Sequence, residues 1–180
     1  MQLLLISLIY IVFSTSVQAQ VVRNTSWNSI EEFKAEEPNI VKNIIWLENN
    51  PTGTNQNDTK GLSENIISWL SNTPYLTVVL DGFFLENLMN NKRFKYAEKF
   101  KVTYLFGKSL YIIEHQDDWD EVQASLRGIE GMIMVYKELK KLDSSLKNST
   151  LEKYSKMRNN GKLESYVKQR LLEPAKPLSY

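Results

Sequence analysis

The stretch "FKYAEKFKVTYLFGKSLYIIEH", from Phe94 to His115, decides the fold of this chain. Its aromatic and aliphatic residues recur every three or four positions, which is the period of an α-helix. Phe100, Tyr104 and Gly107 lie on one stripe of that helix, and further apolar residues cover most of its other faces. Because a helix that is apolar nearly all round must be buried, we predict that this segment is the central helix of an all-α bundle.

The helix that follows is predicted with equal clarity. Asp118 and Glu121 have the spacing of a capping box, and an apolar stripe continues from them to about residue 142. The middle of this helix contains Gly128 and Gly131, and each glycine in a helix interior costs about 1 kcal/mol relative to alanine. We expect a close approach of the two helix backbones to offset this cost, with Gly107 of the central helix opposite.

On the N-terminal side, periodicity and stop signals predict three further helices. The first is short and ends at Pro38, the second runs from Pro38 to about Glu48, and the third runs from about residues 59–63 to Asn72. The polar stretch "PTGTNQNDTKG", residues 51–61, is predicted to form an exposed loop between the second and the third. With short helices predicted later in the chain, the result is a compact single-domain bundle of about six to eight helices.

The segment "YLTVVL", residues 75–80, has the β-branched and aromatic composition of a strand, but it has no clear partner strand. We therefore predict a short, buried, extended connector, followed by a short helix that Asp81 caps. If the protein has a recognition surface, we expect it between Pro74 and Phe84. The candidate binding residues are Tyr75, Leu76, Val78, Val79 and Phe83.

The first 19 residues have the pattern of a secretory signal peptide. An apolar run from Leu3 to Phe13 is followed by small and polar residues up to Ala19, after which we expect cleavage. The run is shorter than the ~20 residues that a membrane-spanning helix needs. We therefore expect an exported, soluble protein, periplasmic or extracellular, with one helical domain over residues 20–180 and a loose tail over residues 173–180.

The chain contains no cysteine and one histidine, and its formal net charge is +1. These counts exclude disulfides, cysteine-based zinc sites and thiol nucleophiles, and they argue against a general binder of nucleic acid. The tripeptide "GKS", residues 107–109, lacks the earlier glycine of a phosphate-binding loop, and we expect no cofactor. Three Asn-x-Ser/Thr triplets would be glycan acceptors in a eukaryotic secretory pathway, at Asn24, Asn57 and Asn148.

The acidic stretch "EHQDDWDE", residues 114–121, holds the densest set of potential ligands. Asp117, Asp118 and Asp120 could bind a hard cation together with His115, although a helix N-terminus explains these acids better, and we expect no metal. Glu114 borders the apolar run of the central helix, and we expect it to be partly buried, as suits a general acid. Glu114 and His115 are therefore the candidate catalytic residues.

Basic residues alternate with aromatic residues where the central helix begins, in "NKRFKYAEKFK", residues 91–101. Such interleaving can bind nucleic acid or an anionic surface. Here the aromatic residues continue the core stripe of the central helix, so we expect the basic side chains on its solvated face. These are Lys92, Arg93, Lys95, Lys99 and Lys101.

Four segments carry a resemblance to known proteins: "WLSNTPYLTV" at 69–78, "YLFGKSLYIIE" at 104–114, "GIEGMIMVYKELK" at 128–140 and "NNGKLESYV" at 159–167. Through them the chain resembles a family of small, helical, exported bacterial proteins of no assigned activity. That resemblance implies an all-α fold and transfers no catalytic residue. The helix with a central glycine, followed by a glycine-containing helix that ends in "VYK", is also similar to periplasmic immunity proteins, which neutralise secreted toxins.

Four functions remain open from these patterns. The leading hypothesis is an exported helical protein that acts by binding, with a protein or peptide as partner and without catalytic chemistry. One alternative is an immunity-like or inhibitor-like periplasmic protein. A second is a cell-wall hydrolase that uses carboxylates, of which Glu114 is the first candidate. A third is a purely structural role in the cell envelope, without a discrete ligand.

Overall fold

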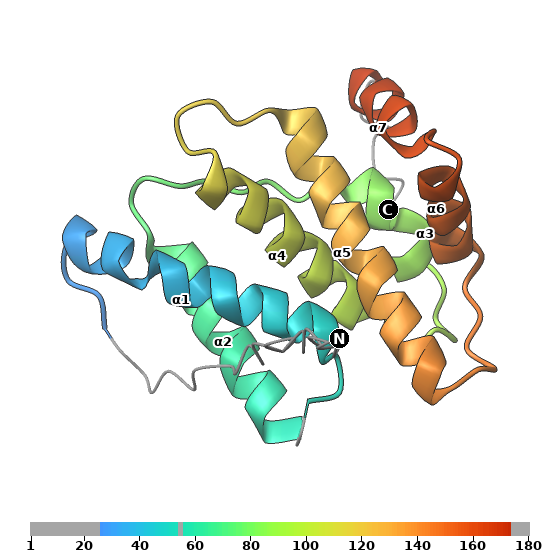
Figure 1. Ribbon diagram of the computed structural model, residues 1–180, viewed down its shortest axis with the longest axis horizontal. Coiled ribbons are helices and arrows are strands. Elements are labelled where there is room, and N and C mark those ends of the chain that lie inside the picture. Colours follow the sequence, from blue (N-terminus) through green and yellow to red (C-terminus); the bar gives the residue numbers. More distant parts are fainter. Residues whose placement is uncertain (1–25, 54–55, 174–180) are drawn as a thin grey trace, which may run out of the picture.

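Seven α-helices make up the part of the chain that the computed structural model describes, residues 26–53 and 56–173 (Figure 1). No strand forms among these residues, which confirms the predicted all-α bundle. The predicted signal peptide and the last seven residues of the predicted tail lie outside the described residues. The helices are α1 (Ile30–Asn49), α2 (Gln56–Asn72), α3 (Gly82–Met89), α4 (Ala97–Glu114), α5 (Glu121–Leu142), α6 (Ser149–Asn159) and α7 (Leu163–Leu172).

The antiparallel pair α4 and α5 forms the middle of the molecule, with α1 and α2 on one side and α3, α6 and α7 on the other (Figure 1). Two apolar clusters lie on the two sides of this pair. Phe100 and Tyr104 of α4 belong to the cluster with α3, α6 and α7, whereas Phe106 and Leu110 belong to the cluster with α1 and α2. Because α4 serves both clusters, it is apolar nearly all round, and the prediction of a buried central helix is confirmed.

The backbones of α4 and α5 meet at two glycines. A Cβ atom on Gly107 would lie 2.8 Å from the carbonyl oxygen of Arg127 and 3.0 Å from Cα of Gly128. A Cβ atom on Gly128 would lie 2.8 Å from the ring of Tyr104. The predicted close approach at Gly107 and Gly128 is therefore present. Gly131 has a different role, because the atom that would meet its Cβ is a carboxylate oxygen of Glu48 in α1.

Pro38 lies inside α1 and does not end it, so the prediction of two separate helices there is wrong. A proline in a helix interior removes one hydrogen bond and costs about 3 kcal/mol. The helix continues because it buries Phe33 before the proline and Ile40 and Ile44 after it in one cluster. The indole of Trp69 also donates a hydrogen bond of 3.2 Å to the carbonyl of Phe33, close to the interruption.

The helix α2 begins at Gln56, so the prediction of a loop over residues 51–61 is wrong over its second half. Asp58 lies in the first turn of α2, where a negative charge interacts favourably with the helix dipole. Of the three possible glycan acceptors, Asn24 and the side chain of Asn57 lie outside the described residues. Asn148 is only 6% exposed, and its side-chain oxygen accepts the N–H groups of residues 150 and 151 as the cap of α6.

Two residues that were predicted to cap helices, Asp81 and Glu121, have another role in the structure. Asp81 precedes α3 but makes no capping hydrogen bond with its side chain, and α5 is capped by Asp120 rather than by Asp118. The Asp120 carboxylate accepts a backbone N–H of the first turn of α5 at 2.9 Å. The carboxylates of Asp81 and Glu121 instead bind the ammonium group of Lys108, which is buried between α4 and α5.

Among residues 26–53 and 56–173, no helix is both long enough and apolar enough to cross a membrane.

The contact between α4 and α5 predicts a stability loss when Gly107 is replaced by alanine. The new Cβ would meet backbone atoms of α5, which cannot move aside as the end of a side chain can. We expect the free energy of unfolding of Gly107→Ala, measured by urea denaturation, to fall by about 1–3 kcal/mol, the usual effect of overpacking.

Gly61 in α2 gives the matched control, because a Cβ there would have no atom within 4 Å. Gly61→Ala should raise the free energy of unfolding by about 0.5–1 kcal/mol, since alanine is the better helix former. A similar increase in both variants would contradict the close contact of the two helices.

Candidate functional site

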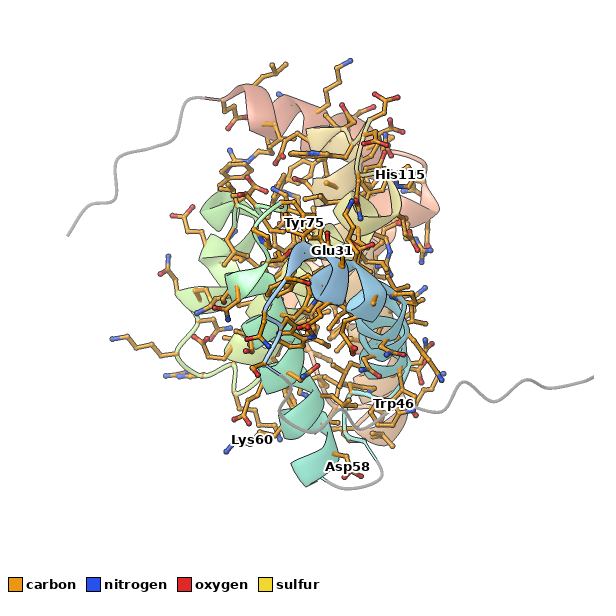
Figure 2. All side chains as sticks on the ribbon, turned by 90° about the vertical axis from the view of Figure 1, so that its left-hand side faces the viewer. Glu31, Trp46, Asp58, Lys60, Tyr75 and His115 are labelled. Carbon is orange, nitrogen blue, oxygen red and sulfur yellow. The ribbon has the colours of Figure 1, made fainter. Side chains whose placement is uncertain are left out.

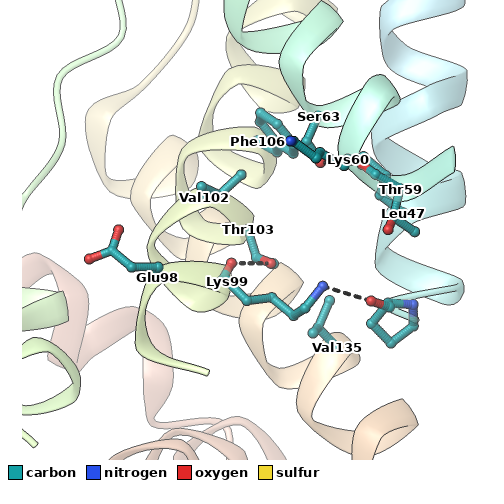
Figure 3. Close-up of a pocket in the computed structure, with 11 residues that line it drawn as sticks. Leu47, Thr59, Lys60, Ser63, Glu98, Lys99, Val102, Thr103, Phe106 and Val135 are labelled. Carbon is teal, nitrogen blue, oxygen red and sulfur yellow. Dashed lines mark hydrogen bonds between the residues drawn. The ribbon is translucent and has the colours of Figure 1, made fainter. Parts of the chain in front are cut away.

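A cavity of about 310 Å³ lies between the end of α1, the start of α2, and the helices α4 and α5 (Figure 3). Its size is at the lower end of the range for small-molecule sites in proteins. Apolar atoms form most of its wall, although six of the eleven lining residues carry a hydroxyl or a charged group. The lining residues are Leu47, Pro51, Thr59, Lys60, Ser63, Glu98, Lys99, Val102, Thr103, Phe106 and Val135.

Lys99, in the first turn of α4, is the half-buried charged group of this cavity. Its ammonium group donates a hydrogen bond of 2.7 Å to the carbonyl oxygen of Pro51. That carbonyl is free to accept because α1 has ended at Asn49, and the turn after it is closed by a hydrogen bond from the N–H of Gly53 to the carbonyl of Asn50. Burial lowers the pKa of the Lys99 ammonium group.

No carboxylate of the described part of the chain forms an ion pair with Lys99. Glu98, the adjacent residue, pairs with Lys101 at 2.9 Å and points away from the Lys99 amine in Figure 3. Lys60 on the other side of the cavity is exposed and lies 3.7 Å from Glu64. An ammonium group has three hydrogens to donate, so Lys99 keeps two donors beyond its bond to Pro51.

Two of the hydroxyl groups that line the cavity, those of Thr103 and Ser63, donate their protons within their own helices and can still accept hydrogen bonds. Thr103 donates to the carbonyl of Lys99 at 2.9 Å, and Ser63 donates to the carbonyl of Thr59 at 2.8 Å. Each hydroxyl oxygen retains acceptor capacity. The cavity therefore offers an apolar wall, a half-buried cation and hydroxyl oxygens, which is a combination suited to binding.

The predicted catalytic residues lie away from this cavity. Glu114 is exposed at the end of α4, so the prediction that it is partly buried is wrong. His115 is also exposed, and its ring stacks on that of Tyr111 with centroids 4.1 Å apart. In Figure 2, His115 lies toward one end of the molecule, whereas Lys60, which lines the cavity, lies toward the other.

The predicted cation ligands are not brought together. Asp117, Asp118 and Asp120 are all exposed in the connection between α4 and α5, and Asp120 is engaged as the cap of α5. No group of three acidic, histidine or cysteine side chains within the described ranges is arranged to hold a metal ion.

The extended connector between α2 and α3 is buried only in its first half. Leu76 is buried, and Tyr75 and Val78 are half-buried against the cluster of α1 and α2. Val79 is 63% exposed, so the prediction of a buried connector is wrong at that end. Phe83, at the start of α3, is half-buried, with the guanidinium of Arg170 5.3 Å from its ring centre.

The hydroxyl of Tyr75 donates a hydrogen bond of 2.7 Å to Glu37 of α1 and so fastens the connector to that helix. Burial, together with the nearby Glu37 carboxylate, raises the pKa of Tyr75 to about 12. The candidate binding residues of the connector therefore divide into a part that holds the fold together and an exposed part around Val79. A binding role for them stays a prediction.

A second polar group lies deeper in the molecule, around Lys108. The Lys108 side chain is fully buried, and its Nζ lies 2.6 Å from Oδ2 of Asp81 and 2.5 Å from Oε1 of Glu121. The Asp81 oxygen also accepts from the hydroxyl of Tyr104 at 2.6 Å, and the hydroxyl of Ser125 lies 3.1 Å from it. The cluster joins the connector to both central helices.

This cluster is closed rather than open to a ligand. Glu121, the most accessible of its charged members, is 40% exposed, whereas Asp81 is 11% exposed and Lys108 is inaccessible. Burial and the charge of Asp81 raise the pKa of Tyr104, which keeps its hydroxyl protonated as a donor. The ion pairs of Lys108 hold the connector and α5 against α4, and we assign this lysine a structural role.

A third buried ion pair ties α1 to α5. Both carboxylate oxygens of Glu48 accept hydrogen bonds from the guanidinium of Arg127, at 2.8 and 2.6 Å. Burial raises the pKa of Glu48, and the hydrogen bonds from Arg127 act in the opposite direction. Gly131 leaves the space that the Glu48 carboxylate occupies. The pair lies next to Leu47 and so holds the end of α1 that lines the cavity.

Sequence reasoning missed Lys99, which was expected on the solvated face of the central helix. One signal could have found it, because Lys99, Thr103 and Phe106 share a helix face at spacings of four and three residues. Lys108 was missed as well, although a single lysine within "YLFGKSLYII" indicates a buried charge that needs partners.

No family model matches this chain, and searches of curated proteins and of solved structures find no match either. The two resemblances stated from the sequence therefore stay predictions, and the function is argued below from the cavity and its side chains.

The Lys108 cluster predicts a large stability loss when its cation is removed. Lys108→Met keeps the length of the side chain but leaves Asp81 without its buried counter-charge. We expect the free energy of unfolding at neutral pH to fall by about 3 kcal/mol, the usual cost of breaking one partner of a buried pair. Urea denaturation followed by circular dichroism measures it.

Lys92→Met makes the same chemical change at an exposed position, where the lysine has no ion pair within the described residues. It should change the free energy of unfolding by less than about 0.5 kcal/mol. Equal effects at the two positions would show that the charge network around Lys108 contributes no stability.

Proposed function

We propose that this chain is an exported helical protein that acts by binding a small ligand in the cavity between α1, α2, α4 and α5. The observation that carries the proposal is the cavity itself, with aliphatic walls and a half-buried lysine held by a backbone carbonyl. Small-molecule sites in proteins are concave, mostly apolar, and contain a few placed polar groups of this kind.

The position of the cavity supports the proposal further. Its walls come from four helices, of which α4 and α5 are held together by their glycine contact and α1 is joined to α5 by the Glu48–Arg127 pair. A site on such elements is formed before the ligand arrives, which reduces the entropy lost on binding. Binding rather than catalysis is also the leading hypothesis from the sequence.

The hydrolase alternative depended on Glu114, which is exposed and does not line the cavity. Neither Glu98 nor Lys60, the other exposed charged groups of the lining, replaces it, since each is paired with an oppositely charged neighbour on its own helix. The immunity-like alternative needs a protein surface rather than a cavity, and no specific contact in the described residues favours it.

A titration with octan-1-ol, observed by two-dimensional NMR of backbone amides, tests the proposal. This neutral, unbranched alcohol suits an apolar cavity of 310 Å³. We expect saturable shifts at the amides of Val102, Thr103, Phe106 and Val135, with a dissociation constant of about 1 mM or tighter, the range for a ligand of this size.

Two valine substitutions give the control. Val102→Phe adds a ring to the cavity wall and should abolish saturable binding, whereas Val122→Phe makes the same change at a half-buried position of α5 that does not line the cavity. Binding should survive in the second variant. Unsaturable shifts spread over the surface, or equal binding by both variants, would refute a binding role for the cavity.

A further inference from the structure

Lys99 differs from two other lysines, Lys60 and Lys101, in having no acidic partner among the described residues. Lys60 lies 3.7 Å from Glu64, and Lys101 lies 2.9 Å from Glu98. Within the described residues, the one hydrogen-bond partner of the Lys99 ammonium group is the carbonyl oxygen of Pro51, at 2.7 Å. A half-buried ammonium group without a counter-charge is costly, and proteins neutralise such groups with a partner.

No acidic side chain among residues 26–53 and 56–173 forms an ion pair with Lys99. Burial alone accounts for the lowered pKa of Lys99, and no carboxylate acts to raise it. A ligand with a negative charge would supply the missing interaction and would favour the charged ammonium group. Lys99 could give such a ligand two hydrogen bonds beyond the one to Pro51.

The rest of the cavity limits what the ligand can be. Leu47, Val102, Phe106 and Val135 offer no hydrogen bonds from their side chains. One half-buried cation matches a single negative charge, whereas a phosphate dianion would need several more charged donors. The volume of 310 Å³ corresponds to about ten non-hydrogen atoms, since one water occupies about 30 Å³ in the liquid.

We propose that the cavity binds a small amphiphilic monoanion, with a carboxylate on the Nζ of Lys99 and an unbranched or compact apolar tail along Leu47, Val102, Phe106 and Val135. This inference rests on the proposed binding function and names its ligand class. A medium-chain fatty acid such as octanoate has the required chemistry and about the required size.

Isothermal titration calorimetry of the protein with octanoate, octan-1-ol and octylamine tests the inference. The three probes share one tail and differ in the charge of the head. Octanoate should bind at least about tenfold more tightly than octan-1-ol, because a hydrogen bond between charged groups changes affinity by about this factor or more. Octylamine should bind most weakly of the three. Octyl sulfate, a monoanion with a larger head, distinguishes a site for carboxylates from one for any anion.

Lys99→Met should weaken octanoate binding at least about tenfold while changing octan-1-ol binding less than about threefold. Lys99→Arg, which keeps the charge, should retain the preference for octanoate. Lys92→Met removes one exposed lysine outside the cavity and should leave all affinities unchanged, which separates the local charge from the net charge.

The outcomes separate the two proposals. If octan-1-ol binds in the cavity and octanoate binds no more tightly, the monoanion inference is overturned and the binding function stands. If none of the probes binds, both are overturned. Should Lys99→Met fail to fold, the comparison of octanoate with octan-1-ol on the unaltered protein still decides the inference.

Discussion

The contact between the backbones of α4 and α5 is the constraint on which the rest of this structure depends. It is possible only because Gly107 and Gly128 carry no side chain where the two helices cross. The pair then presents two apolar faces, one to α1 and α2 and one to α3, α6 and α7. The chain contains no cysteine, so no disulfide links these helices. Apolar packing against the α4–α5 pair must therefore hold the two groups of helices in place.

The same helix α4 carries two lysines with opposite surroundings. Lys108 is paired with Asp81 of the connector and with Glu121 of α5, so two carboxylates face its single positive charge. Lys99 lies near the start of the helix, where it meets a backbone carbonyl and an open cavity instead. The first lysine contributes to the assembly of three segments, and the second is left with capacity for a partner from outside. This difference is why we assign structure to one and binding to the other.

The sequence predicts most of the helices but little of the site. The helical period of the sequence predicted the ends of α4 and α5 to within a few residues, because this signal is local. The glycines on one face of each helix predicted that α4 and α5 come into close contact. Pro38 was read as a helix end, since its cost is local while the burial of Ile40 and Ile44 that offsets it is tertiary. The error arises because local sequence rules contain no information on contacts between distant segments.

The charged residues show the same limit. Asp81 and Glu121 sit where helices begin and were read as caps, yet both turn toward Lys108 on another helix. Lys99 was placed in solvent because nothing in its neighbourhood in sequence reveals that the carbonyl of Pro51 and the wall of α5 enclose it. The candidate site could be recognised only after the end of α1 and the start of α2 had been placed against α4.

Native-state amide hydrogen exchange tests the dependence on the α4–α5 contact most directly. We expect amides near Gly107 and Gly128 to exchange only through global unfolding, with an exchange free energy equal to the free energy of unfolding from denaturation. Amides of α1 and α2 should open at lower free energies. Exchange of the amides around Gly107 through local openings, at a lower free energy than those around Ile44 of α1, would show that the fold does not depend on this contact.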